Sequence, residues 1–382
     1  MSVPKLARGS DNHSWPARLL TELQRYEALN CYLRQSLMQR LASDSWFENR
    51  VIRYVLQRLS WVRDTEETFR VANLGSALNA DEIFRVLSGS AQDFDERLFD
   101  ALAEVRLVAW ARNQGYSHIE KLQTGTGHPT PDFQMEKEGR VHLAEAKHFR
   151  VRDYLAYFIA DRFEGLAFVT GKLTHFGLDV EISYEYQTRM YEIRKNRIQW
   201  VDRARQELTA SALSAFEQKL SNDPHAKIPI LDGLFVVRRS QSVGPGRVSP
   251  ALIGSLCPKE TAQWCLARLR DDLLGKLGQI KGCHGAVGDH ADQAIVFFSG
   301  VDEWEPEWSV VWDALDANDE EAWKQVSAIK QAADQLIGIP FELIVGRYQK
   351  KGRGPNGKAR HGPMQYLPFS WEKKARPHKA WR

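Results

Sequence analysis

The sequence predicts a mixed α/β fold that follows a helical N-terminal region. Apolar residues recur at helical spacing over about the first 90 residues, and alternation of apolar and polar residues begins near residue 118. Segments of both kinds then interleave as far as residue 345. With 382 residues, the chain is long enough for one large domain or for two smaller ones.

Helices are expected first. Leu19 and Leu23 are four residues apart, as are Val51 and Val55, so each pair lies on one helical face. A helix over about residues 95–114 ends at a glycine and precedes a change to period two. We expect strands over residues 118–122, 131–136, 140–147, 166–170, 180–186, 234–238, 294–298 and 341–345, and later helices over 198–220, 259–278 and 319–336.

These elements suggest three parts: a helical region over 1–90, an α/β domain over 91–346 and a basic tail over 347–382. The tail contains a single acidic residue, and glycine and proline are frequent between residues 352 and 363, which predicts irregular structure there. Its cations would be attracted to phosphates, so it is expected to be either a nucleic-acid-binding arm or a solubilising terminus. The candidate nucleic-acid contacts in it are Lys350, Lys351, Arg353, Lys358 and Arg360.

Composition narrows the class of protein. Apolar residues make up 43% and charged residues 26%, which is ordinary globular usage. No segment has the length and apolar character of a signal peptide or a membrane span, so the expectation is a cytoplasmic protein without a membrane partner. The formal charge is only +3 and does not identify a partner. The 4 cysteines are too few for a disulfide framework.

The chemistry is concentrated between residues 130 and 148. Strand alternation places Glu145 and Lys147 on one face, with Ala146 between them on the other. If Glu138 and Gly139 form a two-residue hairpin turn, Asp132 falls directly opposite Glu145.

Two carboxylates opposed in this way suit one metal ion. Their Cβ atoms would be roughly 5 Å apart, close enough to share a cation. Carboxylate oxygens with open positions suit Mg²⁺, with Mn²⁺ as an alternative, and such a centre promotes phosphodiester hydrolysis. Lys147 would position the attacking water or stabilise charge in the transition state.

Glu104 is the third candidate acid. Its helical neighbours Ala101, Val108 and Ala111 are small or apolar, so its carboxylate would lie on a partly apolar stripe. Such a position is costly for a charge that is neither paired nor bound to metal.

Pro131-Asp132 followed by Glu145-Ala146-Lys147 resembles the motif of the PD-(D/E)xK nuclease superfamily, which includes restriction-endonuclease-like enzymes. The resemblance implies a mixed sheet flanked by helices, with a preceding helix that supplies an acidic ligand at Glu104. It implies that Asp132 and Glu145 bind the metal, aided by the Ala146 carbonyl. It also favours DNA over RNA as the substrate.

Other interpretations stay open. His128, in a glycine-rich loop, could reach the substrate. An RNA-directed nuclease would use the same metal centre, and a nucleic-acid-binding or partner-binding protein could keep the fold without catalysis. Enzymes of this kind often dimerise, so a homodimer or a partner protein is compatible with the sequence.

Overall fold

The computed structural model describes residues 15–41, 55, 59–73, 94–122, 130–149, 154–171, 177–240, 252–254, 258–284, 291–299, 306–353 and 359–373. The chain divides into two compact units. The small-sheet unit takes Met1–Tyr26, Leu33–Leu59 and Arg152–Ser255, and the large-sheet unit takes Glu27–Tyr32, Ser60–Val151 and Leu256–Arg382. The α/β class is therefore as predicted, but the strands belong to two separate sheets.

The N-terminal region is helical where the structure describes it. The Glu66 carboxylate accepts hydrogen bonds from the backbone N–H groups of Ala28 and Leu29, at 3.1 and 2.9 Å. Both N–H groups lie in the first turn of a helix, where they have no partner within it, so Glu66 caps that helix from a neighbouring one. The helices are α1 (Trp15–Gln24), α2 (Glu27–Leu41) and α4 (Leu59–Ala72).

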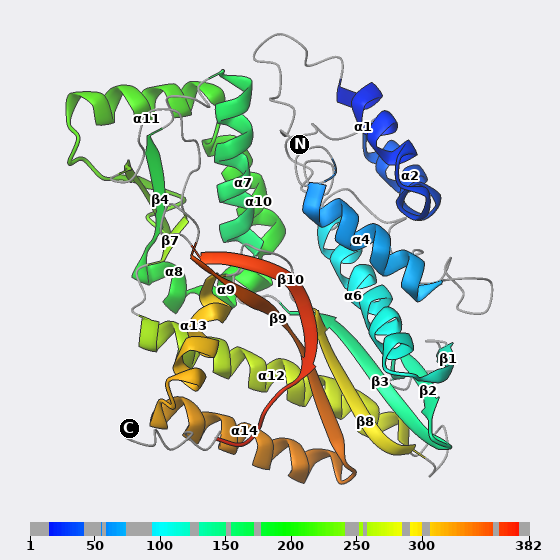
Figure 1. Cartoon of the computed structure of the whole chain (residues 1–382). Helices are drawn as coiled ribbons and strands as arrows, with labels where there is room; N and C mark the ends of the chain where they lie inside the picture. Colours follow the sequence, from blue (N-terminus) through cyan, green and yellow to red (C-terminus); the bar gives the residue numbers. More distant parts are fainter. Residues whose placement is uncertain are drawn as a thin grey trace, which may run out of the picture. The chain divides into compact units, whose positions relative to one another are not determined.

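A six-stranded mixed sheet organises the large-sheet unit (Figure 1). Its order is β1-β2-β3-β8-β9-β10, in which the three central strands are parallel and the outer pairings are antiparallel. The strands are β1 (Ser117–Lys121), β2 (Phe133–Lys137), β3 (Arg140–His148), β8 (Ala291–Ser299), β9 (Phe341–Arg353) and β10 (Ala359–Pro368).

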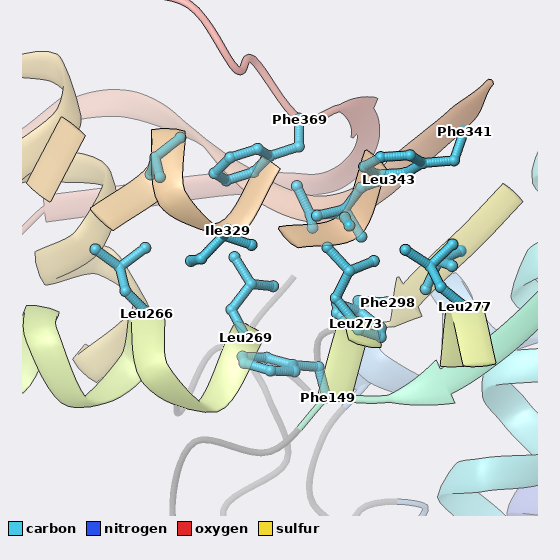
Figure 2. Close-up of a cluster of buried hydrophobic side chains, with 14 of the residues drawn as sticks. Phe149, Leu266, Leu269, Leu273, Leu277, Phe298, Ile329, Phe341, Leu343 and Phe369 are labelled. Atoms are coloured by element: carbon cyan, nitrogen blue, oxygen red, sulfur yellow. The ribbon is translucent and has the colours of Figure 1, made fainter. Parts of the chain in front are cut away.

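Helices cover both faces of this sheet, as a parallel centre requires. Trp110 of α6 packs against Phe297 on one face, with ring centroids 6.0 Å apart. On the other face, α12 presents a stripe of leucines to Phe298 and Leu343 (Figure 2). The helices are α6 (Phe94–Asn113), α12 (Pro258–His284), α13 (Pro306–Asp316) and α14 (Glu320–Ile337). Among the described helices, none is long and apolar enough to cross a membrane.

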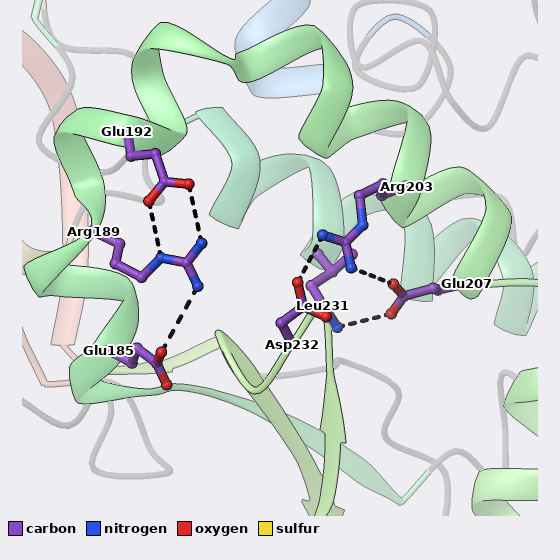
Figure 3. A network of polar contacts seen from close by, with 7 residues as sticks. All are labelled: Glu185, Arg189, Glu192, Arg203, Glu207, Leu231 and Asp232. Carbon is purple, nitrogen blue, oxygen red and sulfur yellow. Dashed lines mark hydrogen bonds and ion pairs between the residues drawn. The ribbon is translucent and has the colours of Figure 1, made fainter.

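The small-sheet unit has its own core. Its strand order is β5-β6-β4-β7, and buried aromatic residues such as Phe163, Trp200 and Phe235 fill the space between sheet and helices. Two arginine-carboxylate networks surround this core: Arg189 binds Glu185 and Glu192, and Arg203 binds Glu207 and Asp232 (Figure 3). The elements are α7 (Tyr154–Val169), β4 (Leu178–Ile182), α8 (Tyr184–Thr188), α9 (Met190–Lys195), α10 (Arg197–Glu207), α11 (Ala210–Asn222), β5 (Ile228–Ile230), β6 (Phe235–Arg239) and β7 (Leu252–Gly254).

Three elements of this unit differ from the prediction. The strand expected over 180–186 ends at Ile182, and Tyr184 begins the helix α8. The expected strand over 166–170 is the last turn of α7, because its apolar residues continue a helical stripe that buries Ile159, Phe163 and Leu166. The expected single helix over 198–220 is two helices. Thr209 caps the second of them by accepting a hydrogen bond from the N–H of Ala212, at 3.2 Å.

The prediction of irregular structure in the basic tail is also wrong. Residues 347–353 continue β9, and 359–368 form β10, so regular structure enters the glycine- and proline-containing segment expected to be irregular. The chain after β10 also joins the core. The N–H of Phe369 donates to the Leu343 carbonyl at 2.7 Å, and the Phe369 ring stacks edge-on against Trp371, with centroids 4.8 Å apart. Pairing of β9 with β10 and burial of these rings outweigh the local preference for a loop.

Candidate active site

The hairpin between β2 and β3 sets the register of the candidate site. Glu138 and Gly139 have positive φ values of 53° and 74°, as a type I′ turn requires. Lys137 pairs with Arg140, and Phe133 pairs with Ala144. The next position along the ladder sets Asp132 against Glu145, which confirms the predicted register.

Asp132 is fixed just before the start of β2. Its Oδ2 atom accepts a hydrogen bond from the Ala146 N–H at 2.8 Å, and its carbonyl accepts one from the Leu122 N–H at 3.0 Å. The N–H and C=O of a strand residue point toward the same neighbouring strand. The Ala146 carbonyl therefore points to the Asp132 side of β3.

Glu145 is a buried acid, with 1% of its surface exposed. Its Oε2 atom lies 2.5 Å from Nζ of Lys276 on α12. Burial raises the pKa of Glu145 to about 9, and the charge of Asp132 and a side-chain hydrogen bond with Asp132 raise it as well, while Lys276 opposes the shift. The two carboxyl groups are thus close enough to interact directly.

Glu104 enters the same centre from α6, as the apolar stripe around it predicted. Its Oε2 atom lies 2.5 Å from Nζ of Lys121 on β1, and that ammonium lies 3.5 Å from Oδ1 of Asp132. Burial raises the pKa of Glu104 to about 7, followed by the charge of Asp132, while Lys121 and Lys276 lower it. Lys121 therefore joins the two acids in one network.

Lys147 shares the face of Glu145 but binds a different acid. Its Nζ atom donates to Oδ1 of Asp272 on α12 at 2.7 Å, and Nε of Arg268 lies 3.0 Å from the other Asp272 oxygen. The pair Glu145 and Lys147 on β3 thus faces the pair Lys276 and Asp272 on α12, with opposite charges matched.

The histidines of β3 lie on the opposite face, as expected. His148 stacks on Phe99 of α6 with ring centroids 5.0 Å apart, and His142 meets the edge of Tyr116 at 5.1 Å. Burial lowers the pKa of His142 and so favours its neutral form. Both histidines are packing residues of the α6 face.

Lys121, Asp272 and Lys276 were missed by reasoning from the sequence. One signal for the helical pair was present, because Arg268, Asp272 and Lys276 follow one another at four-residue spacing beside the buried leucine stripe of α12. No pattern in the neighbouring sequence indicates that Asp272 and Lys276 contact residues of β3. For Lys121, the only signal in the sequence was its position in the strand predicted over residues 118–122.

The remaining candidate residues lie elsewhere. His128 and Lys358 fall outside the described residues. Lys350, Lys351 and Arg353 lie on β9 and Arg360 lies on β10, within the ribbon that these two strands form.

The donor set fits a hard divalent cation by its chemistry. Asp132, just before β2, Glu145 on β3 and Glu104 on α6 offer carboxylate oxygens, and the Ala146 carbonyl points to the Asp132 side. Ammonium groups instead contact these oxygens, and within the described residues no set of three or more acidic, His or Cys side chains is arranged to hold a metal ion. A cation would have to displace at least one ammonium group.

Comparison of the chain with family models, with curated proteins and with solved structures finds no match. Interpretation of the site therefore depends on its own residues and their geometry.

Proposed function

We propose that this chain is a metal-dependent nuclease with a restriction-endonuclease-like core that hydrolyses phosphodiester bonds in DNA. The observation that supports the proposal is the convergence of Asp132, Glu145 and Glu104 at one buried centre, from three different elements. Buried acids with strongly raised pKa values cluster at functional sites, because a buried charge lowers stability unless it is paired or bound to a metal.

The proposed metal is Mg²⁺ or Mn²⁺, held by Asp132 and Glu145 with help from Glu104 and the Ala146 carbonyl. When bound, it would polarise the phosphate and ease deprotonation of a water molecule. Lys147 would contribute positive charge near the phosphate, 2.7 Å from the Asp272 oxygen that positions it.

The overall reaction is a hydrolysis. The water oxygen forms a bond to phosphorus, and the bond from phosphorus to the leaving sugar oxygen breaks. One water proton passes to solvent, and the leaving oxygen acquires one. Glu145 is 1% exposed, and a low local dielectric strengthens the electrostatic effect of the nearby ammonium groups.

A basic ribbon is the proposed nucleic-acid interface. The register of β8 with β9 ends at Val345, whereas β9 and β10 stay paired out to Arg353 and Ala359. No acidic residue occurs from residue 343 to residue 371, while basic residues are frequent. A two-stranded ribbon with this charge suits the backbone and major groove of duplex DNA.

The experiment is a cleavage assay with single-stranded DNA, duplex DNA and RNA, each with Mg²⁺, Mn²⁺ or EDTA. Wild type should cut DNA with metal and not with EDTA, and Asp132→Ala and Lys147→Ala should both lose cutting. Glu136→Ala is the matched control, because Glu136 is a partly exposed acid on the same face of β2 and should leave cutting unchanged. Preferential cutting of RNA would move the proposal to an RNA-directed nuclease.

A second candidate is a nucleic-acid-binding protein that has lost catalysis. One observation favours it: each candidate metal-binding carboxylate already has an ammonium group within ion-pair distance. DNA binding that survives Asp132→Ala and Lys147→Ala, without cutting by wild type under any condition, would select this candidate.

A further inference from the structure

Three lysines surround the carboxylate centre, and their partners differ. Lys147 is held by Asp272, whose other oxygen is engaged by Arg268. Its ammonium is therefore paired with a carboxylate outside the proposed metal ligands. Only 31% of the Lys147 side chain is exposed, and the Asp272 side chain is 7% exposed, so this pair is partly shielded from solvent.

Lys121 is enclosed on several sides. Its Nζ atom contacts Glu104 at 2.5 Å and Asp132 at 3.5 Å, and it lies 5.0 Å from the centre of the Phe133 ring. Its side chain is 9% exposed. Two carboxylates and an aromatic face hold this ammonium in place, which suits a structural counter-charge between α6 and β2.

Lys276 is placed differently. Its Nζ atom lies 2.5 Å from Oε2 of Glu145, the most deeply buried of the three acids, and its side chain is 20% exposed. It comes from α12, whose leucine stripe is anchored in the core one residue further along at Leu277. The ammonium thus reaches the centre on a flexible side chain from a rigid helix.

We propose that Lys276 is a further catalytic residue of this centre, which contacts Glu145 while no cation is bound and contacts the substrate phosphate once a divalent cation has taken over that carboxyl group. The proposal rests on the nuclease function proposed above. Lys276 transfers no proton in this role. It supplies positive charge to the phosphate oxygens while the water oxygen bonds to phosphorus and the leaving sugar oxygen departs.

The first test is Mn²⁺ affinity without nucleic acid, measured by electron paramagnetic resonance. Lys276→Met removes a positive charge that competes with the cation at Glu145, so Mn²⁺ should bind at least about tenfold more tightly. Lys147→Met should change the affinity less than about threefold, because Lys147 pairs with Asp272 and not with a proposed metal ligand. Lys281→Met, at an exposed position of the same helix, should match wild type.

The second test is single-turnover cleavage of duplex DNA at saturating Mn²⁺. Lys276→Met should be at least about a hundredfold slower than wild type. Lys276→Arg, which keeps the charge, should recover part of the rate, and Lys281→Met should not be impaired. Thermal denaturation identifies any unfolded variant, and Lys276→Gln, which can still donate to Glu145, then replaces Lys276→Met.

Two results would overturn the role of Lys276. One is a Lys276→Met cleavage rate equal to that of wild type, and the other is an unchanged Mn²⁺ affinity. Absence of cleavage by wild type is a separate result, because it would refute the nuclease function and, with it, the role of Lys276.

Discussion

The charges of the acids and lysines at the centre bear directly on the proposed cation site. Asp132, Glu145 and Glu104 face two ammonium groups, those of Lys121 and Lys276, among the contacts of the described centre. If all five groups were ionised, the centre would carry one excess negative charge in a buried place. The raised pKa values of Glu104 and Glu145 reflect this excess together with burial. A divalent cation would relieve it.

The first prediction concerns pH. The pKa of Glu145 is about 9 in the folded protein, against an ordinary value of 4.5, so the folded state binds more protons than the unfolded state between these values. The free energy of unfolding should therefore fall as pH rises through that window in the absence of metal. Mn²⁺ should oppose the fall and release protons when it binds.

Thermal denaturation from about pH 5 to about pH 9, with and without Mn²⁺, measures this effect. Glu145→Gln cannot ionise at this position, so its melting temperature should depend less on pH than that of wild type. Equal pH dependence in the two proteins would assign the effect to other groups, Glu104 first among them.

At the scale of elements, the β2–β3 hairpin determines which acids meet. A shift of one residue in its register would move Glu145 to the α6 face and away from Lys276. The turn fixes this register by its two positive φ values, although Glu138 is a residue for which such a conformation costs about 1 kcal/mol. The helix α12 then supplies the charges that match β3.

The second prediction therefore concerns the turn. Glu138→Asn should stabilise the protein by about 0.5 kcal/mol, because asparagine favours the first central position of a type I′ turn. Gly139→Val should destabilise it by more than about 1 kcal/mol, since a β-branched residue disfavours positive φ. Urea denaturation measures both. A stabilising effect of Gly139→Val would contradict the turn assignment.

At the scale of the whole molecule, the segment Arg152–Ser255 lies in the chain between β3 and α12, yet it belongs to the small-sheet unit. The large-sheet unit must therefore bring together residues from before and after this segment. Its core includes Leu143 on one side of the segment and Leu269 on the other. Its carboxylate centre depends on the same long-range pairing.

The third prediction follows from the two separate cores. Leu234→Ala, at a fully buried position of the small-sheet unit, should increase amide hydrogen exchange in α7, β4 and β6 more than in β3 and β8. Leu269→Ala should have the reverse pattern. Equal loss of protection in both units for either variant would mean that the chain unfolds as one cooperative body.

The parts predicted from sequence are those fixed by local rules. The hairpin register follows from strand alternation and turn chemistry, and the placement of Glu104 follows from helical spacing. The contacts of Lys147 with Asp272 and of Glu145 with Lys276 join residues more than a hundred positions apart, so spacing alone could not reveal them. The β9–β10 ribbon was missed for a different reason, since the pairing of these two consecutive strands overrides local glycine and proline preferences.

The central claim is that Asp132 and Glu145 form one divalent cation site, and Mn²⁺ binding measured by electron paramagnetic resonance tests it most directly. Wild type should bind Mn²⁺, Asp132→Asn and Glu145→Gln should each weaken binding by at least about tenfold, and Glu136→Gln should not. Absence of binding by wild type, or equal affinity in all four proteins, would contradict the claim.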